Sequence, residues 1–331
     1  MKTLIRNIAQ LVAVPPGPVV GARFSLPPII ENAAVLIDGE DIVWFGPGEE
    51  APASRIEHLL DAQGGTVVPG LVDCHTHVVF AGSREREYVQ RLRGATYVDT
   101  LERGGGIRDS VRALRTTSLD DLVEQSRPRL QRMLAGGVTT VEAKTGYGLN
   151  QEDELKTLLA IRRLNEELPI EIVPTYLGAH TVPPEYSGRA DDYLALMTEP
   201  SFLRRLRDER LAEFADAFCD RGAFNLEQAR RFLTACREYG LRPKIHAEQL
   251  SNSGATQLGI VLGAVSADHL EHIDDETIAA MKQSSTIPVI LPGCSFFLGT
   301  PPAPVRKMIE AGLPVAIATD CNPGSCMIES L

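Results

Sequence analysis

Two histidines, His75 and His77, are separated by one residue near the end of an apolar run at residues 67–80. In an extended strand successive side chains point to opposite faces, so residues i and i+2 point the same way, roughly 6–7 Å apart along the backbone. Two imidazoles directed at one point can begin a metal site. The pair could equally be two core or surface histidines, so the positions of the other histidines must decide between these interpretations.

The elements that would position these histidines alternate along the chain from residue 66 onward. Short apolar runs alternate with longer charged segments of helical periodicity, such as residues 119–134, 152–167 and 226–239. The apolar runs predict eight strands, at residues 67–79, 138–144, 170–180, 214–219, 243–246, 265–269, 287–291 and 314–320. Strand and helix repeated in this way over about 250 residues are typical of a (β/α)8 barrel, which is an α/β fold.

A doubly wound open sheet is the alternative arrangement for such a pattern. No glycine-rich phosphate fingerprint follows the first predicted strand, which disfavours this alternative. The triplet Gly104-Gly105-Gly106 precedes a helical segment and could bind an anion at a helix N-terminus. A loop over the mouth of the barrel is the favoured interpretation of the triplet.

The barrel interpretation makes a prediction about the polar residues, because the chemistry of such barrels lies at the C-terminal ends of the strands. Five of the seven histidines fall at these ends together with one aspartate: His75, His77, His180, His246, His269 and Asp320. His58 and His272 do not. A random distribution would seldom place so many imidazoles at one edge, so the pattern favours a metal site over unrelated histidines.

Composition limits the classes of function. The chain has 331 residues, of which 44% are hydrophobic, so it can bury a large core. Its net charge of −11 argues against nucleic acid or an anionic membrane as a partner. The six cysteines form no C-x-x-C pair, and no run approaches about 18 apolar residues or resembles a signal peptide. We therefore expect reduced thiols, no membrane span and a cytoplasmic location.

Residues 1–65 form a segment of short β-type runs. The runs 32–37 and 42–45 flank Asp38-Gly39, which predicts a hairpin with Asp-Gly in its turn. The segment is too short to stand alone. We therefore expect a small β-sandwich domain that includes residues 1–65, beside a catalytic barrel at residues 66–331.

Several motifs resemble a known family. They lie at residues 69–77 (PGLVDCHTH), 77–85 (HVVFAGSRE), 94–97 (GATY), 138–148 (VTTVEAKTGYG), 177–180 (LGAH), 244–249 (KIHAEQ), 266–269 (SADH) and 318–325 (ATDCNPGS). The first resembles the opening motif of the amidohydrolase superfamily of metal-dependent barrels, and the others are similar to the imidazolonepropionases within it. The resemblance covers essentially the whole chain. It implies hydrolysis of the cyclic amide C–N bond of 4-imidazolone-5-propanoate to N-formimidoyl-L-glutamate, a step of histidine degradation.

The resemblance also implies a metal site. One Zn²⁺ or Fe ion per subunit would be held by His75, His77, His246 and Asp320. Three imidazoles and a carboxylate suit such an ion and leave a position open for water. Binuclear barrels of the superfamily carry a carbamylated lysine at the end of the fourth strand, whereas the run 214–219 ends without a lysine, so we expect a single metal.

Three further residues have expected roles in proton transfer or in a buried ion pair. In the implied reaction the metal lowers the pKa of water to about 7, and the resulting hydroxide attacks the ring carbonyl. His269 is the candidate for proton transfer, with a purely structural histidine as the alternative, and Asp320 can pass a proton to the leaving nitrogen. Lys144, on the second strand, is expected to form a structural pair with Glu142 or Asp73.

Substrate binding requires a cation for the propanoate group. Arg84, in the loop after the first strand, can bind it bidentately, with a surface salt bridge as the alternative. Tyr147 and His180 would hydrogen-bond the carboxylate and the ring. Gln249 stands where many family members carry Glu, and because an amide cannot accept a proton at neutral pH, we expect it to position the reacting groups. Further polar groups for the ring or product would come from Asn322, Gly324 and Ser325.

Two other functions are compatible with parts of this pattern. The first is another cyclic-amide hydrolase or a deaminase of the same superfamily, because the metal ligands alone do not set the substrate. Arg84, Tyr147 and the run 142–148 argue against it. The second is an inactive barrel that serves as a binding module, which an intact ligand set disfavours.

The resemblance carries two further expectations. The partner would be a small-molecule substrate, and a homodimer is common among family members. Those members continue for several tens of residues beyond the position of Leu331. We therefore expect a C-terminal segment of the small β-domain to be absent from this chain, by truncation or because the sequence is incomplete.

Overall fold

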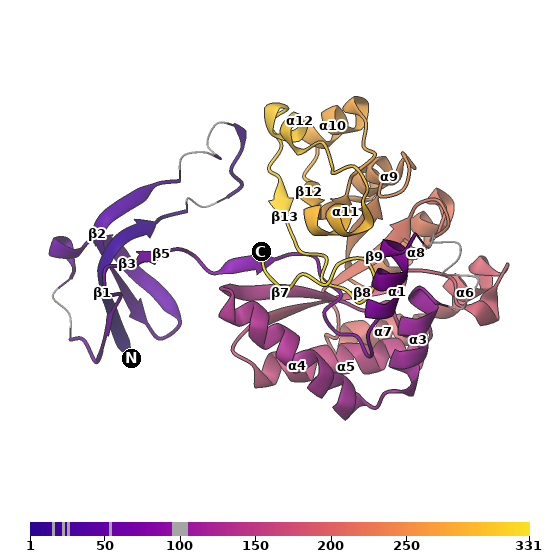
Figure 1. Cartoon of the computed structure of the whole chain (residues 1–331), viewed down its shortest axis with the longest axis horizontal. Coiled ribbons are helices and arrows are strands. Elements are labelled where there is room, and N and C mark those ends of the chain that lie inside the picture. Colours follow the sequence, from indigo (N-terminus) through magenta and orange to yellow (C-terminus); the bar gives the residue numbers. More distant parts are fainter. Residues whose placement is uncertain (15–16, 22–23, 25–26, 53–54, 95–104) are drawn as a thin grey trace. The chain divides into compact units, whose positions relative to one another are not determined.

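The computed structural model of the chain describes residues 1–331 apart from 15–16, 22–23, 25–26, 53–54 and 95–104 (Figure 1). Most of the GATY motif at residues 94–97, and Gly104, therefore lie outside the described residues. The chain divides into two compact units, Met1–Gly70 and Leu71–Leu331. Each unit has a hydrophobic core of its own.

The first unit is a sheet that contains five strands among the described residues. They are β1 (Lys2–Val12), β2 (Ile29–Asp38), β3 (Asp41–Pro47), β4 (His58–Asp61) and β5 (Thr66–Val67), with a short 3-10 helix, η2 (Gly48–Glu50). β2 and β3 pair antiparallel and form the predicted hairpin, in which Gly39 has the positive φ of 66° that a tight turn requires. β1 pairs antiparallel with β2 and parallel with β4 and β5. The small separate β-domain is thus confirmed.

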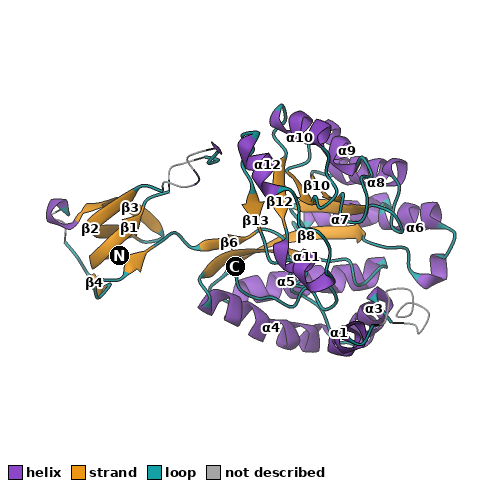
Figure 2. Cartoon of the chain, turned by 45° about the horizontal axis from the view of Figure 1, so that its top comes forward, coloured by secondary structure: helices purple, strands orange, loops and turns teal. Residues whose placement is uncertain are grey.

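The second unit is built on a sheet of eight parallel strands, as counted among the described residues, and they are neighbours in chain order. They are β6 (Leu71–Asp73), β7 (Val138–Lys144), β8 (Glu171–Ala179), β9 (Phe214–Cys219), β10 (Arg242–Ala247), β11 (Ser266–His269), β12 (Ile287–Ile290) and β13 (Ala316–Ile317). Figure 2 shows these strands surrounded by helices. The predicted (β/α)8 architecture is confirmed.

The barrel is closed by the segments that follow its first and last strands. Thr76 forms a parallel bridge with Cys321, the amide of Asp320 donates to the carbonyl of His75 (3.0 Å), and the amide of His77 donates to the carbonyl of Cys321 (2.9 Å). These bonds place the two predicted metal-binding segments side by side, although they are more than two hundred residues apart in the sequence.

The first barrel strand is shorter than predicted. We expected one strand over residues 67–79, but Val67 belongs to β5 of the first unit and β6 covers only Leu71–Asp73. Pro69-Gly70 separates the two strands, and proline lacks the amide that would continue a ladder. His75 and His77 therefore follow the strand and are held by the closing bonds to residues 320 and 321.

Helices follow or connect the strands. They are α1 (Glu85–Leu92), α3 (Ile107–Thr116), α4 (Leu119–Ala135), α5 (Gln151–Glu167), α6 (Ala190–Met197), α7 (Pro200–Asp208), α8 (Leu226–Glu238), α9 (Ala255–Leu262), α10 (Asp275–Lys282), α11 (Pro292–Leu298) and α12 (Val305–Glu310), with the 3-10 helix η3 (Pro184–Tyr186). Several begin at a residue whose side chain accepts a backbone amide of the first turn, namely Ser118, Asn150, Asn225 and Asp274. These caps satisfy amides that a helix start otherwise leaves unpaired.

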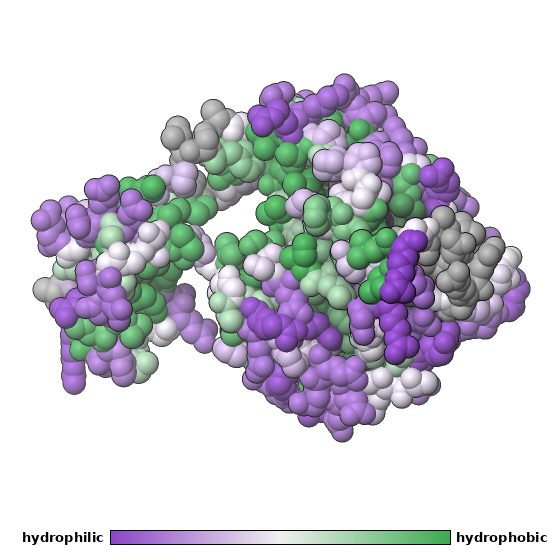
Figure 3. All heavy atoms as spheres, viewed as in Figure 1, coloured by the Kyte–Doolittle hydropathy of each residue, from purple (hydrophilic) through white to green (hydrophobic). Residues whose placement is uncertain are grey.

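The helices bury one face and expose the other. In α5, for example, Leu158, Ile161 and Leu164 are fully buried, whereas the surface over α4 and α5 is mostly hydrophilic in Figure 3. Burial of such an apolar stripe is the main favourable contribution to packing a helix on the sheet. Among the described residues, no helix combines the length and the apolar character needed to cross a bilayer.

Candidate metal and substrate site

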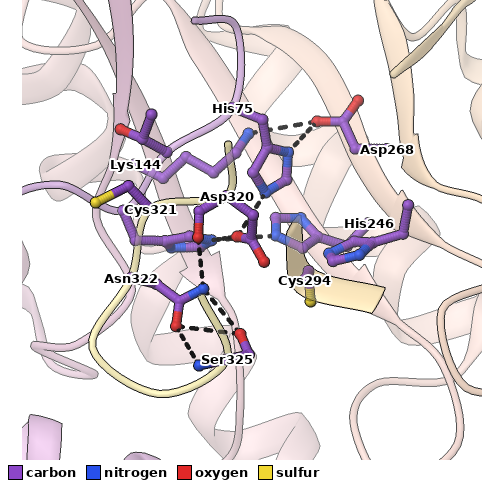
Figure 4. Close-up of polar contacts among 12 residues, drawn as sticks. His75, Lys144, His246, Asp268, Cys294, Asp320, Cys321, Asn322 and Ser325 are labelled. Carbon is purple, nitrogen blue, oxygen red and sulfur yellow. Dashed lines mark hydrogen bonds and ion pairs between the residues drawn. The ribbon is translucent and has the colours of Figure 1, made fainter. Parts of the chain in front are cut away.

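The C-terminal edge of the barrel brings the predicted histidines together. His75 and His77 follow β6, His246 lies on β10, His269 ends β11, and Asp320 follows β13, and all five side chains are buried. The ring centroids of His75 and His246, both labelled in Figure 4, are 4.5 Å apart. Those of His75 and His77 are 5.4 Å apart, and those of His246 and His269 are 5.3 Å apart. His58 lies in the first unit, as expected for a residue outside the cluster.

The ligand atoms of this cluster match the spacing of a metal site. Nε2 of His246 lies 3.4 Å from Nε2 of His77, and Oδ1 of Asp320 lies 3.5 Å from Nε2 of His75 and 3.6 Å from Nε2 of His77. Two ligands held at 2.0–2.1 Å in a tetrahedral zinc site are roughly 3.3–3.4 Å apart. Nε2 of His75 is buried and has no hydrogen-bond partner among the described residues. The residues present therefore fit a divalent ion of borderline softness.

Two buried carboxylates orient these imidazoles. Nδ1 of His75 donates to Oδ2 of Asp268 (2.6 Å), and Nδ1 of His246 lies 2.9 Å from Oδ2 of Asp216. A histidine whose Nδ1 is held in this way directs its Nε2 lone pair at the metal position. The sequence analysis missed the roles of both aspartates, although each lies in a buried strand, where an unpaired carboxylate would be costly.

The same carboxylates belong to a buried network with two lysines. Nζ of Lys144 lies 2.9 Å from Glu142 and 2.7 Å from Asp216, and Nζ of Lys244 lies 2.8 Å from Glu142. Burial acts to lower the pKa of Lys144, but the charges of Asp216 and Glu142 outweigh burial and raise it. Burial acts to raise the pKa of Asp216, but His246 and Lys144 hold it well below its usual range. Both groups therefore remain ionised.

The expected pair of Lys144 with Glu142 is present, but the alternative pair with Asp73 was wrong. Asp73 instead accepts the amide (3.0 Å) and the hydroxyl (2.6 Å) of Thr319. These bonds join the end of β6 to the residue before Asp320. Asp73 therefore positions the predicted carboxylate ligand.

The imidazoles differ in their preferred protonation state. Burial, followed by the charge of Lys144, lowers the pKa of His75 well below the ordinary value, and burial, followed by His180, does the same for His77. Both rings are thus neutral, as metal ligands must be. For His269 burial also acts to lower the pKa, but the nearby carboxylate of Glu271 outweighs burial and raises the pKa. His269 is therefore suited to accept a proton.

Glu271 is a second residue that the sequence analysis missed. Its Oε1 lies 3.8 Å from Nδ1 of His269 and accepts the hydroxyl of Ser295 (2.9 Å). His269 itself has a φ of 85°, and Asp320 has a φ of 55°, in the left-handed region that non-glycine residues seldom occupy. Backbone strain of this kind concentrates at functional sites, where the surrounding structure maintains it.

A cavity of about 780 Å³ opens above the cluster. We call the four predicted metal ligands the base (His75, His77, His246 and Asp320), of which all but His75 line the cavity, and we call three further lining side chains the wall (Arg84, Tyr147 and His180). Arg84 donates from Nε (3.0 Å) and Nη2 (2.8 Å) to Glu87, and Glu87 accepts the amide of Gly106 (2.8 Å) through its other oxygen. The predicted carboxylate-binding arginine thus lies in the cavity, already oriented.

The other wall residues are held by the loop after β7. Nδ1 of His180 lies 2.8 Å from the carbonyl of Gly146, and burial raises the pKa of Tyr147, which keeps its hydroxyl a donor. Glu154 of α5 accepts the amides of Gly146 (3.0 Å), Gly148 (2.8 Å) and Leu149 (2.8 Å). Glu154, which the sequence analysis also missed, therefore fixes the loop that carries Tyr147.

The remaining predicted residues line the cavity, but their polar groups are largely occupied. The side chain of Asn322 donates to the carbonyl of Asp320 (2.7 Å) and accepts the amides of Gly324 (2.8 Å) and Ser325 (2.7 Å). Nε2 of Gln249 lies 3.7 Å from the sulfur of Cys294. In this conformation Asn322 shapes the loop after β13.

The neighbouring carboxylate, Glu248, does not replace the missing glutamate at position 249. It is buried and accepts the hydroxyl of Ser253 (3.2 Å) and the amide of Thr256 (3.1 Å) at the start of α9. Its hydrogen bonds thus hold the loop after β10, and Glu248 itself is not among the residues that line the cavity.

Comparison with known proteins agrees with this geometry. The model of the amidohydrolase family matches residues 66–331. The chain is 46% identical to a protein named imidazolonepropionase from Geobacillus kaustophilus (strain HTA426), over 98% of this chain and 78% of that protein. It is 43% identical to the protein of the same name from Bacillus cereus (strain ATCC 10987 / NRS 248), over 100% of this chain and 78% of that protein.

Solved structures share the fold at low identity. Atrazine chlorohydrolase TrzN from Arthrobacter aurescens TC1, complexed with zinc, is 18% identical with a TM-score of 0.71, over 98% of this chain and 73% of that chain. An adenosine deaminase from Xanthomonas campestris with bound zinc is 15% identical with a TM-score of 0.64, over 98% of this chain and 70% of that chain.

Proposed function

The chain belongs to the amidohydrolase family, and from this membership and the geometry of its site we infer its reaction. It hydrolyses the cyclic amide C–N bond of 4-imidazolone-5-propanoate in histidine degradation. The oxygen of water adds to the ring carbonyl carbon, the bond to the ring nitrogen breaks, and that nitrogen takes up a proton, which gives N-formimidoyl-L-glutamate. The observation that carries this proposal is one cavity with metal-ligand spacing at its base and an oriented arginine on its wall.

The base would hold one divalent ion, zinc or iron, through His75, His77, His246 and Asp320. When bound, the ion supplies a Lewis acid that polarises the ring carbonyl and lowers the pKa of water to about 7. The chain contributes the orientation of the ligands. Asp268 and Asp216 hold the rings of His75 and His246, and Lys144 and Lys244 form ion pairs with these two aspartates.

Proton transfer falls to His269. It lies beside the base, with its ring centroid 5.5 Å from that of His75, and Glu271 keeps it basic. His269 would accept a proton from the attacking water, and the imidazolium would stabilise the anionic intermediate. Asp320, buried between His269 and the other imidazoles, would return a proton to the departing ring nitrogen.

Substrate orientation falls to the wall. Glu87 occupies Nε and Nη2 of Arg84, so Nη1 would meet the propanoate together with the hydroxyl of Tyr147. A Cβ atom at Gly324 would lie 2.1 Å from Nη1 of Arg84, so the loop must carry glycine there for the guanidinium to keep its place. His180 would hydrogen-bond the ring, and Gln249 would fix its position.

The test combines metal analysis with turnover of freshly generated 4-imidazolone-5-propanoate. We expect about one zinc or iron ion per chain and hydrolysis that a chelator stops. Arg84→Ala should raise KM by about 10–100-fold, the value of a charged hydrogen bond of roughly 1.5–3 kcal/mol, whereas Arg86→Ala, exposed on α1, should not. Metal-dependent hydrolysis of other cyclic amides without turnover of this substrate would support the rival assignment, and metal without any turnover would support a binding module.

A further inference from the structure

A second group of metal-ligand atoms lies beside the base. One ligand atom each from His269, Cys294 and Asp320 lies within 4.8 Å of the others. Cys294 and Asp320 are labelled in Figure 4. The three residues come from the end of β11, from α11 and from the segment after β13, and all are buried. The group thus combines an imidazole, a thiol and a carboxylate at one point of the barrel edge.

The proposed reaction leaves Cys294 without a role. The thiol contacts Nε2 of Gln249 at 3.7 Å, and burial, followed by the charges of Asp320 and Glu271, raises its pKa well above the ordinary value. Zinc can displace the proton of a cysteine when other ligands hold the ion in place.

We propose that His269, Cys294 and Asp320 form a second site for zinc, weaker than the first, and that filling it stops turnover. The site rests on the proposed function, because it shares Asp320 with the first ion. The contacts of Asp320 with His75 and His77 use Oδ1, so the second ion would take Oδ2. Carboxylates bridge ions in this way in sites whose two metals lie about 3.5–4 Å apart.

The types of ligand at the second site determine which ion it prefers, and its position next to His269 determines how that ion affects turnover. Thiolate and imidazole favour zinc over harder ions such as magnesium or manganese. An ion at this site occupies the imidazole of His269, which then cannot accept a proton from water. The second ion therefore inhibits the enzyme whose first ion activates it.

Cobalt provides a readout that does not depend on turnover. Protein that carries one ion per chain would be titrated with Co²⁺ and then with Zn²⁺. The base contains no sulfur, so a near-ultraviolet thiolate-to-cobalt charge-transfer band reports the second site alone. We expect a second equivalent of cobalt, the band, and at least a tenfold loss of turnover to develop together, and zinc to remove the band.

Variants of Cys294 separate this site from general effects of metal. Cys294→Ser and Cys294→Ala should retain the first ion and its turnover, lack the band, and need at least tenfold more zinc for inhibition. Cys326→Ser is the matched control, because Cys326 is a buried thiol of the same apolar cluster but not of the ligand group, and it should behave like the parent.

Two results would overturn the inference. One is a second ion that binds without the thiolate band, and the other is unchanged zinc inhibition in both Cys294 variants. Protein that binds no first ion and shows no turnover would instead refute the proposed function, and with it the shared site.

Discussion

Two imidazoles of the base, His75 and His246, are held by buried carboxylates, whereas the wall residues Arg84 and Tyr147 lie in loops whose backbone amides are bound by glutamates. Asp216 and Asp268 fix two imidazoles and are in turn paired with Lys144. On the wall, Glu87 and Glu154 accept amides of Gly106 and of the loop that carries Tyr147. The base therefore has ligand geometry fixed by charge, and the wall has a shape that loops can adjust.

This difference predicts a hierarchy of effects. Removal of a base residue should abolish metal binding and chemistry together. Removal of a group that handles protons should leave the metal in place. We call the carboxylates that hold these residues the anchors (Asp216, Asp268, Glu87 and Glu154). Removal of an anchor at the base should lower the affinity for metal, and removal of an anchor at the wall should raise KM.

His246→Ala should have the largest effect. It removes one of the three imidazoles of the base, so the variant should purify with little metal. Because the ion lowers the barrier by several kcal/mol, kcat/KM should fall by at least about 10⁴-fold. Metal analysis and turnover measure both outcomes. A variant that retains one ion per chain and turnover would show that the base does not hold the metal.

His269→Ala should separate chemistry from metal binding. We expect one ion per chain and a fall in kcat of about 10²–10⁴-fold, the usual contribution of a general base. Glu271→Gln, which leaves the imidazole in place, should cost less than the alanine variant. If His269→Ala lost its metal, His269 would belong to the base, and the assignment of separate roles would be wrong.

Asp216→Asn tests the charge network beneath the base. The amide cannot hold Nδ1 of His246 or balance Lys144 as the carboxylate does, so metal affinity should weaken by about 10–100-fold. Competition with a chelator of known affinity measures this change. Asp275→Asn, at an exposed position on α10, is the control. Equal affinity in both variants would show that the buried network is purely structural.

Much of the base could be predicted from the sequence because its signal is local. Alternating strand-like and helix-like runs predicted the barrel, and the five histidines and Asp320 at the ends of those runs predicted a metal site there. The choice of His75, His77, His246 and Asp320 as its ligands came from the family resemblance. The anchors could not be predicted in this way, because Asp268 and His75 are separated by 193 residues and meet only through the fold. Their one local signal is a charged residue inside a strand, such as Asp216 between Ala215 and Ala217.

The first barrel strand shows where a local pattern misleads. Its apolar run was read as one strand over residues 67–79, because periodicity does not reveal that the run is divided between two sheets. Lys144 shows the same limit for charges, since its partner Asp216 lies two strands away in the sheet and could not be distinguished by sequence from Asp73. Local patterns identify which residues are exceptional, and the closure of the barrel decides what they contact.

Glu154→Gln should have the smallest effect and tests the wall. Glu154 accepts three backbone amides, and glutamine, with one acceptor oxygen in place of two, must leave at least one of them poorly satisfied. A lost hydrogen bond of about 0.5–1.5 kcal/mol would loosen the loop that carries Tyr147 and raise KM by roughly 2–10-fold. Steady-state kinetics measure this change, and metal content and kcat should stay near those of the parent.

The matched control for this variant is Glu152→Gln, which makes the same change at an exposed position in the first turn of α5. Its KM should remain that of the parent, because its carboxylate holds none of the three loop amides. A fall in metal content in Glu154→Gln, at unchanged KM, would mean that the loop supports the base. The separation of the cavity into a base fixed by charge and a wall adjusted by loops would then fail.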